Sequence, residues 1–103
     1  MLPKDILLDI SGRIHMILPS AKVNLFGSRA RGTHWQESDW DILILTEQPV
    51  TTSIKSEIHT KLFPLSVQIG AFINTLTISE NEWLNNPSYY SLHKTSDKDM
   101  IPV

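Results

Sequence analysis

Residues 27–45 read GSRARGTHWQESDWDILIL and join two segments of different chemistry. The first segment, Gly27–Gly32, follows the short apolar run Val23–Phe26, which is typical of a β-strand. The second segment places Asp39 and Asp41 directly before a run of apolar residues. The stretch therefore predicts two strand ends that meet, one followed by a glycine turn and the other preceded by a pair of carboxylates.

The glycine turn has the composition of an anion site. Gly27 permits backbone conformations that other residues avoid, and a strand that ends in Gly-Ser and turns into a short polar helix leaves backbone N–H groups unpaired. Ser28 adds a hydroxyl donor, and Arg29 and Arg31 carry planar charged groups that match phosphate oxygens. Phosphate is therefore the predicted ligand, and a solvated basic loop is the alternative.

The two aspartates are predicted metal ligands. Side chains two positions apart on a strand share a face, so Asp39 and Asp41 lie side by side where the buried strand Ile42–Leu45 begins. Carboxylates there need a compensating charge, and Mg²⁺ accepts hard oxygen ligands together with water and phosphate oxygens. The alternative is that Asp39 caps a turn while Asp41 pairs with an arginine. Trp40 faces the opposite side of the sheet and is predicted to lie in the core.

These segments resemble the signature of the minimal nucleotidyltransferase domains, small relatives of DNA polymerase β and kanamycin nucleotidyltransferase. The signature combines G-S-x-A-R-G, a polar spacer and S-D-x-D before apolar residues, and the chain resembles it over Val23–Leu45. The resemblance implies a polymerase-β-like fold of the α/β (α+β) class, a small mixed sheet flanked by helices. It also implies that Gly27 and Ser28 hold the nucleotide phosphates and that the two aspartates, the catalytic pair, hold Mg²⁺. Arg31 would lie near the phosphates, and Arg29 occupies a variable position of the signature.

Length and charge limit the class of protein. A chain of 103 residues is expected to form a single nucleotidyltransferase-like domain, residues 1–103, with one core. A net charge of −2 argues against general nucleic-acid binding, which needs a broad basic face. The absence of cysteine excludes disulfides, thiolate catalysis and cysteine-ligated zinc. The sequence has neither a signal segment nor an apolar run near the roughly 20 residues of a membrane helix, so we expect a soluble, cytoplasmic protein.

Apolar spacing and caps predict the other elements. An amphipathic helix is predicted over Pro3–Leu18 and the first strand over Ala21–Phe26. A crossover helix is predicted to begin at one of the residues 51–53. Its apolar residues recur every four positions, at Ile54, Ile58 and Leu62. Ser79–Glu82 forms a capping box that predicts a short helix, and residues 94–103 are expected to be a flexible tail.

The third strand decides the expected chemistry. Leu65–Ile73 follows a proline and alternates apolar with other residues, so we predict the third strand there. Active members of the resembled family bring a third carboxylate from this strand, and that pattern points to Gln68, or to Ser66 if the register is shifted. Neither residue is acidic, and Glu47 or Glu57 is the alternative source of an acid. Because this carboxylate helps to hold the catalytic metal and accepts the proton of the attacking hydroxyl, its loss affects transfer more than nucleotide binding.

Two functions from different classes follow. The first is Mg²⁺-dependent transfer of a nucleoside monophosphate, AMP from ATP, onto a hydroxyl group. Small relatives are often encoded beside an all-helical partner of the HEPN type, as antitoxin to its toxin, and some transfer AMP onto a tyrosine of that partner. The resemblance thus implies a partner protein that carries the hydroxyl. The second function is a non-catalytic module that binds nucleotide and partner but has lost the third carboxylate.

Overall fold

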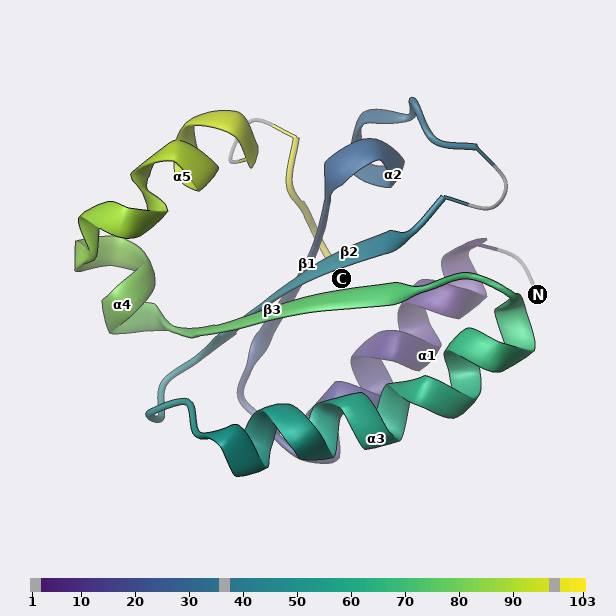
Figure 1. Cartoon of the computed structure of the whole chain (residues 1–103), viewed down its shortest axis with the longest axis horizontal. Coiled ribbons are helices and arrows are strands. Elements are labelled where there is room, and N and C mark those ends of the chain that lie inside the picture. The colour runs from purple at the N-terminus through teal and green to yellow at the C-terminus, as the bar shows by residue number, and fades with distance from the viewer. Residues whose placement is uncertain (1–2, 36–37, 97–98) are drawn as a thin grey trace.

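The computed structural model describes residues 3–35, 38–96 and 99–103. The elements, in chain order, are α1 (Pro3–His15), β1 (Lys22–Phe26), α2 (Gly27–Arg31), β2 (Trp40–Thr46), α3 (Thr52–Ile69), β3 (Ile73–Ser79), α4 (Glu80–Asn85), the 3₁₀ turn η1 (Pro87–Tyr89), α5 (Tyr90–Ser96) and β4 (Ile101–Pro102). The four strands form one sheet in the order β3-β2-β1-β4 (Figure 1). β1 is antiparallel to β2 and β4, whereas β2 and β3 are parallel and are joined by the crossover helix α3. The predicted fold class, a mixed sheet flanked by helices, is confirmed.

The sheet packs a core on each of its faces. α1 and α3 cover one face (Figure 1), and Trp40 and Ile42 of β2 point into the core between them and the sheet. Leu43 points to the opposite face, where it packs with Trp83 of α4. Because side chains alternate along a strand, Asp41 shares this second face with Leu43. The predicted burial of Trp40 is confirmed, since only 3% of the residue is exposed.

Two predicted helix starts are confirmed by their caps. The Thr51 hydroxyl accepts a hydrogen bond from the Ile54 N–H at 3.1 Å, which makes Thr51 the cap of α3. The Ser79 hydroxyl accepts one from the Glu82 N–H at 3.2 Å at the start of α4. α1 ends at His15, earlier than predicted.

The predicted third strand is wrong in its position. α3 continues through Pro64 to Ile69, and the strand follows at Ile73–Ser79. The physical reason is that Leu65 and Ile69 extend the helical spacing of the apolar residues before them, so Leu65 is fully buried while Val67 is 66% exposed. Gly70, in the left-handed conformation with φ of 69°, ends the helix.

Because residues 65–69 form a helix and not a strand, two substitutions are expected to differ in their effect on the free energy of unfolding. Leu65→Ala is expected to lower the free energy of unfolding by about 2–5 kcal/mol, because it removes a fully buried side chain. Val67→Ala is expected to change it by less than about 0.5 kcal/mol, because Val67 lies on the exposed side of α3. Urea unfolding followed by tryptophan fluorescence measures both. Similar losses for the two variants would indicate side chains on one face of a strand and would contradict the helix.

The last strand joins the far edge of the sheet. Ile101–Pro102 pairs with β1, and the Val103 N–H donates to the Val23 carbonyl at 2.8 Å. Residues 97–98 of the predicted flexible tail lie outside the described residues. In the part of the chain that the structure describes, no helix has the length and apolar character to cross a membrane.

Candidate functional site

Three strands bring the predicted site residues to one end of the sheet. The antiparallel register pairs Phe26, the last residue of β1, with Asp41 near the start of β2. The parallel register then pairs Asp41 with Asn74 near the start of β3. The turn that begins at Gly27 therefore lies beside both aspartates, as the sequence predicts.

Gly27 is required at its position for two separate reasons. Its backbone has φ of 75°, a conformation that residues with a side chain rarely adopt. A Cβ atom at this position would also overlap the carboxylate of Asp41. The missing side chain thus allows the Asp41 carboxylate to lie directly against the glycine turn, which places the predicted phosphate and metal ligands next to each other.

Asn74 links the two aspartates. Its side-chain N–H₂ donates to Asp39 Oδ2 at 2.9 Å and to Asp41 Oδ1 at 3.3 Å. One amide can make both bonds only if the two carboxylates converge, so the expected side-by-side arrangement of the aspartates is present. Asp39 is exposed and Asp41 is half-buried, which leaves the pair open to a ligand from solvent.

The predicted position of the third acid, Gln68 or Ser66, is wrong. In the resembled family this acid comes from the strand after the crossover, and that strand is β3. Ser66 and Gln68 lie on α3 instead, so neither holds the position, and Asn74 stands there as the strand neighbour of Asp41. The sequence signal that was missed is a polar residue at the start of the strand that follows Gly70.

The described residues supply no replacement acid. Among them, no group of three or more His, Cys, Asp or Glu side chains is arranged to hold a metal ion. Glu47 follows the far end of β2 and Glu57 lies within α3, so neither joins Asp39 and Asp41. The side chains that converge here are two carboxylates and one neutral amide.

Arg29 binds the segment that leads into β2. Its Nε and Nη2 atoms donate to the Ser38 carbonyl at 3.1 and 2.8 Å, and its guanidinium lies 4.0 Å from the centre of the Trp40 ring. Burial lowers the pKa of Arg29, and the nearby charge of Asp39 opposes that effect. These contacts hold the turn and the start of β2 together, and a phosphate contact by Arg29 stays a prediction.

The other predicted phosphate ligands lie on α2. Ser28 is half-buried in its first turn, and Arg31 is exposed at its end. No side chain caps the start of this helix. α2 begins at Gly27, which lies directly against Asp41, and this agrees with a phosphate site, while the roles of Ser28 and Arg31 stay predictions.

Comparisons with known proteins give a family and a fold. The family model described as "Polymerase beta, Nucleotidyltransferase" matches residues 19–84. A search of curated proteins finds no significant match. A solved structure described as "Crystal structure of the toxin-antitoxin with AMP-PNP" has a TM-score of 0.62 and 19% sequence identity. That similarity covers 98% of this chain and 72% of the other chain, and it shows a shared fold.

The family match includes every residue of the site. It spans 66 of the 103 residues and contains the glycine turn, both aspartates and Asn74. As the resemblance predicts, the chain belongs to the polymerase β nucleotidyltransferase family.

Proposed function

We propose that the chain binds a nucleoside triphosphate with Mg²⁺ and transfers its nucleoside monophosphate, AMP from ATP, to a hydroxyl group. The observation that carries this proposal is the convergence of Asp39 and Asp41 against the glycine turn, in a member of a nucleotidyltransferase family.

The donor set fits Mg²⁺. Two carboxylates converge on one amide, and oxygen ligands of this kind are those that Mg²⁺ takes in proteins. Asp39 and Asp41 would hold the ion, and a rotation of the Asn74 amide would offer its oxygen as a neutral third ligand. When bound, the ion would offset the negative charge of the phosphates.

The glycine turn would hold the phosphates. The backbone at Gly27 and the hydroxyl of Ser28 would donate hydrogen bonds to phosphate oxygens, and Arg31 would add a positive charge. Because Asp41 touches Gly27, a nucleotide bound to the turn would have its phosphates beside the carboxylates. Arg29 would act indirectly, since it fixes the Ser38–Trp40 segment that carries Asp39.

Asn74 limits the rate of transfer. In the reaction, the acceptor oxygen forms a bond to the α-phosphorus, the bond to pyrophosphate breaks, and the acceptor proton is released. A third carboxylate would accept that proton, whereas a neutral amide is not a base. The proton would therefore pass to water or phosphate, and we expect slow transfer with normal nucleotide binding.

The neutral amide of Asn74 also favours a second candidate function, binding without catalysis. A domain that binds a nucleotide and a partner protein without transfer needs the turn and the two aspartates but not the base. Asn74, in place of the acid, is the observation that favours it.

The solved structure with the same fold supports a partner protein. Its description names a toxin-antitoxin and AMP-PNP, an analogue of ATP. We infer that this chain is the antitoxin of a toxin-antitoxin pair, with a helical toxin of the HEPN type as its partner. The acceptor hydroxyl would then be a side chain of the toxin.

Isothermal titration with ATP tests the nucleotide site. The wild-type protein is expected to bind ATP more tightly with Mg²⁺ than with a chelator. The double variant Asp39→Asn, Asp41→Asn is expected to lose about tenfold or more of the Mg²⁺-dependent affinity, because amides are weaker ligands than carboxylates. Asp5→Asn with Glu57→Gln is the control, since it removes two negative charges from exposed helix positions. Failure of the wild type to bind ATP, or equal binding by the variant, would contradict the proposal.

A further inference from the structure

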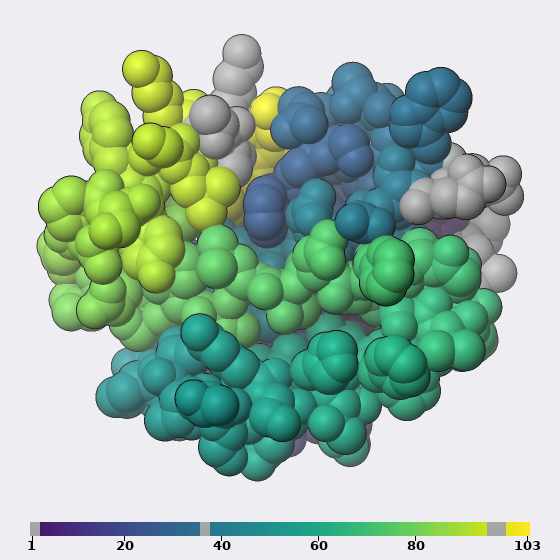
Figure 2. All heavy atoms as spheres, viewed as in Figure 1, coloured from purple at the N-terminus to yellow at the C-terminus, as the bar shows by residue number. Residues whose placement is uncertain are grey.

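A hollow of about 310 Å³ lies at the end of the sheet opposite to the two aspartates. Asp41 is near the start of β2, whereas this hollow borders Thr77–Ser79, which pair with the end of β2. In Figure 1, α4 follows directly from this end of β3, and in Figure 2 the green band of β3 meets the yellow-green atoms of α4 there. At about 3.3 Å per residue, the path along β2 from Asp41 to Thr46 is roughly 16 Å long, so the hollow is separate from the proposed nucleotide site.

The hollow combines charged, polar and apolar groups from three parts of the chain. Lys55 comes from the start of α3 and Glu82 from the first turn of α4. Thr77 comes from the edge strand β3, and Val50 and Ile78 add apolar surface. Sites for small molecules typically combine apolar walls with a few convergent polar groups in this way.

The backbone of Thr77 supplies an unpaired donor and an unpaired acceptor. The Trp40 N–H bonds to the Phe72 carbonyl at 2.9 Å, and with the parallel register this turns the peptide groups of Thr77 away from β2. Among the described residues, none donates to its carbonyl or accepts from its N–H. Thr77 is nevertheless only 8% exposed. Because buried peptide groups normally have hydrogen-bond partners, water or a ligand in the hollow must supply them.

The two charged side chains of the hollow are not paired with each other. The ion pairs found in the part of the chain that the structure describes involve neither Lys55 nor Glu82. One oxygen of Glu82 accepts a hydrogen bond from the Asn86 amide at 2.8 Å, which holds the carboxylate on the side of α4. A positive and a negative group thus line the same hollow without neutralising each other. This arrangement is complementary to a small ligand that carries both charges.

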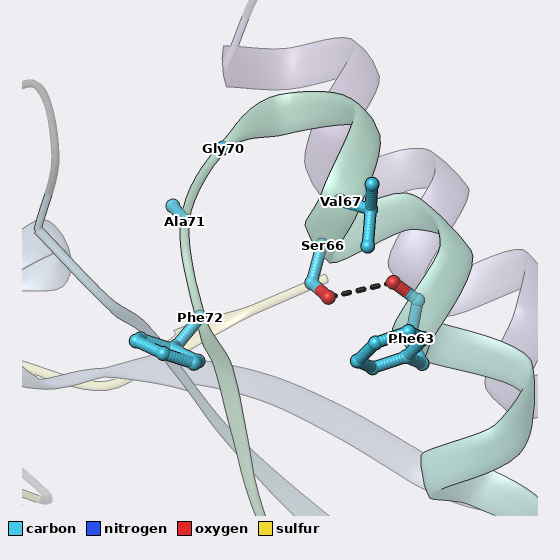
Figure 3. Close-up of a pocket in the computed structure, with 6 residues that line it drawn as sticks. All are labelled: Phe63, Ser66, Val67, Gly70, Ala71 and Phe72. Carbon is cyan, nitrogen blue, oxygen red and sulfur yellow. Dashed lines mark hydrogen bonds between the residues drawn. The ribbon is translucent and has the colours of Figure 1, made fainter.

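A hollow of similar size at the other end of β3 lacks these features. It measures about 300 Å³ and lies between the end of α3 and Phe72 (Figure 3). The Ser66 hydroxyl in it already donates to the Phe63 carbonyl at 2.6 Å. No charged side chain is among the described residues that line it. Its composition therefore does not select a ligand, in contrast to that of the hollow at Thr77.

We propose that the hollow at Thr77 binds a free α-amino acid with an apolar side chain. The α-carboxylate accepts hydrogen bonds from the Lys55 ammonium and the Thr77 N–H. The α-ammonium donates to the Glu82 carboxylate and the Thr77 carbonyl. The side chain of the amino acid packs against Val50 and Ile78. Each polar group of the hollow then has a partner of complementary charge or hydrogen-bonding character.

An NMR titration of the ¹⁵N-labelled protein with L-leucine tests this site. The amide signal of Thr77 is expected to be among those that shift most, whereas the signals of Asp39 and Asp41 stay in place. N-acetyl-leucine lacks the ammonium group and leucinamide lacks the carboxylate, so each is expected to bind about tenfold or more weakly than leucine. The titration contains no nucleotide, so its result does not depend on the proposed function.

Two variants test the charged groups separately. Lys55→Met and Glu82→Gln are each expected to weaken leucine binding by about tenfold or more. Lys61→Met and Glu57→Gln are the matched controls, because they remove the same charges from exposed positions of α3 outside the hollow. The NMR spectrum of each variant verifies its fold. The proposal is overturned if leucine shifts no signal at millimolar concentration, or if both uncharged analogues bind as tightly as leucine. It is also overturned if Lys55→Met and Glu82→Gln bind leucine as tightly as the controls do.

Discussion

Asn74→Asp is expected to raise the rate of nucleotidyl transfer about 100-fold, which is the lower range for a general base in an enzyme. The substitution restores a carboxylate beside Asp39 and Asp41, where the Asn74 amide now bonds to both. It adds the proton acceptor that the site lacks and leaves the glycine turn unchanged. The affinity for ATP with Mg²⁺ is expected to change little.

Pyrophosphate release from ATP measures this effect, with N-acetyltyrosinamide as a surrogate hydroxyl acceptor. Gln68→Asp is the matched control, because it adds the same charge on the exposed surface of α3. If Gln68→Asp accelerates transfer and Asn74→Asp does not, the placement of the third acid on β3 is wrong. If neither variant shows any transfer while ATP binding is intact, the non-catalytic candidate function is favoured.

The same substitution is expected to couple stability to Mg²⁺. Asn74→Asp replaces a hydrogen-bond donor by a third carboxylate, so three like charges converge in the absence of a cation. Thermal unfolding of Asn74→Asp is therefore expected to shift upward with Mg²⁺ more than that of the wild type. This readout does not depend on the identity of the acceptor.

The part of the site that is local in sequence could be predicted. Asp39 directly precedes β2 and Asp41 is its second residue, so the extended backbone turns both side chains to the same side. Gly27 directly follows the last residue of β1. The partnership of Arg29 with Trp40 and the Ser38 carbonyl could not be predicted, because it depends on the path of the loop between two strands. The local motif therefore predicts which candidate ligands lie together, but it does not predict the contacts of every charged side chain.

The third strand could not be placed for a physical reason. Leu65, Val67 and Ile69 fit a strand by alternation, but Leu65 and Ile69 also continue the helical spacing of Ile58 and Leu62. Tertiary packing against α1 and the sheet selects the helix, even though a proline lies inside it. Asn74 reaches the site only through the parallel register between β2 and β3. Such a register depends on the crossover as a whole and has no local sequence signature.

Gly27→Ala is expected to lower the free energy of unfolding by about 2–4 kcal/mol, from backbone strain at positive φ together with a clash. The new methyl group would overlap the Asp41 carboxylate, so this side chain must move away from the turn. Because the proposed nucleotide site requires Asp41 beside the turn, Mg²⁺-dependent ATP binding is expected to fall as well. Urea unfolding and titration with ATP measure the two effects on the same protein.

Substitutions at two other glycines distinguish the two causes of the lost stability in Gly27→Ala, which are backbone strain and the clash with Asp41. Gly32 has φ of 76°, but a Cβ atom added there would have no neighbour within 4 Å. Gly32→Ala is therefore expected to lower the free energy of unfolding by about 1 kcal/mol, through backbone strain alone. Gly12 lies within α1 with free space around it, so Gly12→Ala is expected to stabilise the protein by about 0.5–1 kcal/mol. Only Gly27→Ala should impair ATP binding. If Gly32→Ala lowers stability and binding as much as Gly27→Ala, the effect comes from the backbone of the turn, and the close approach of Asp41 to Gly27 has no role in the site.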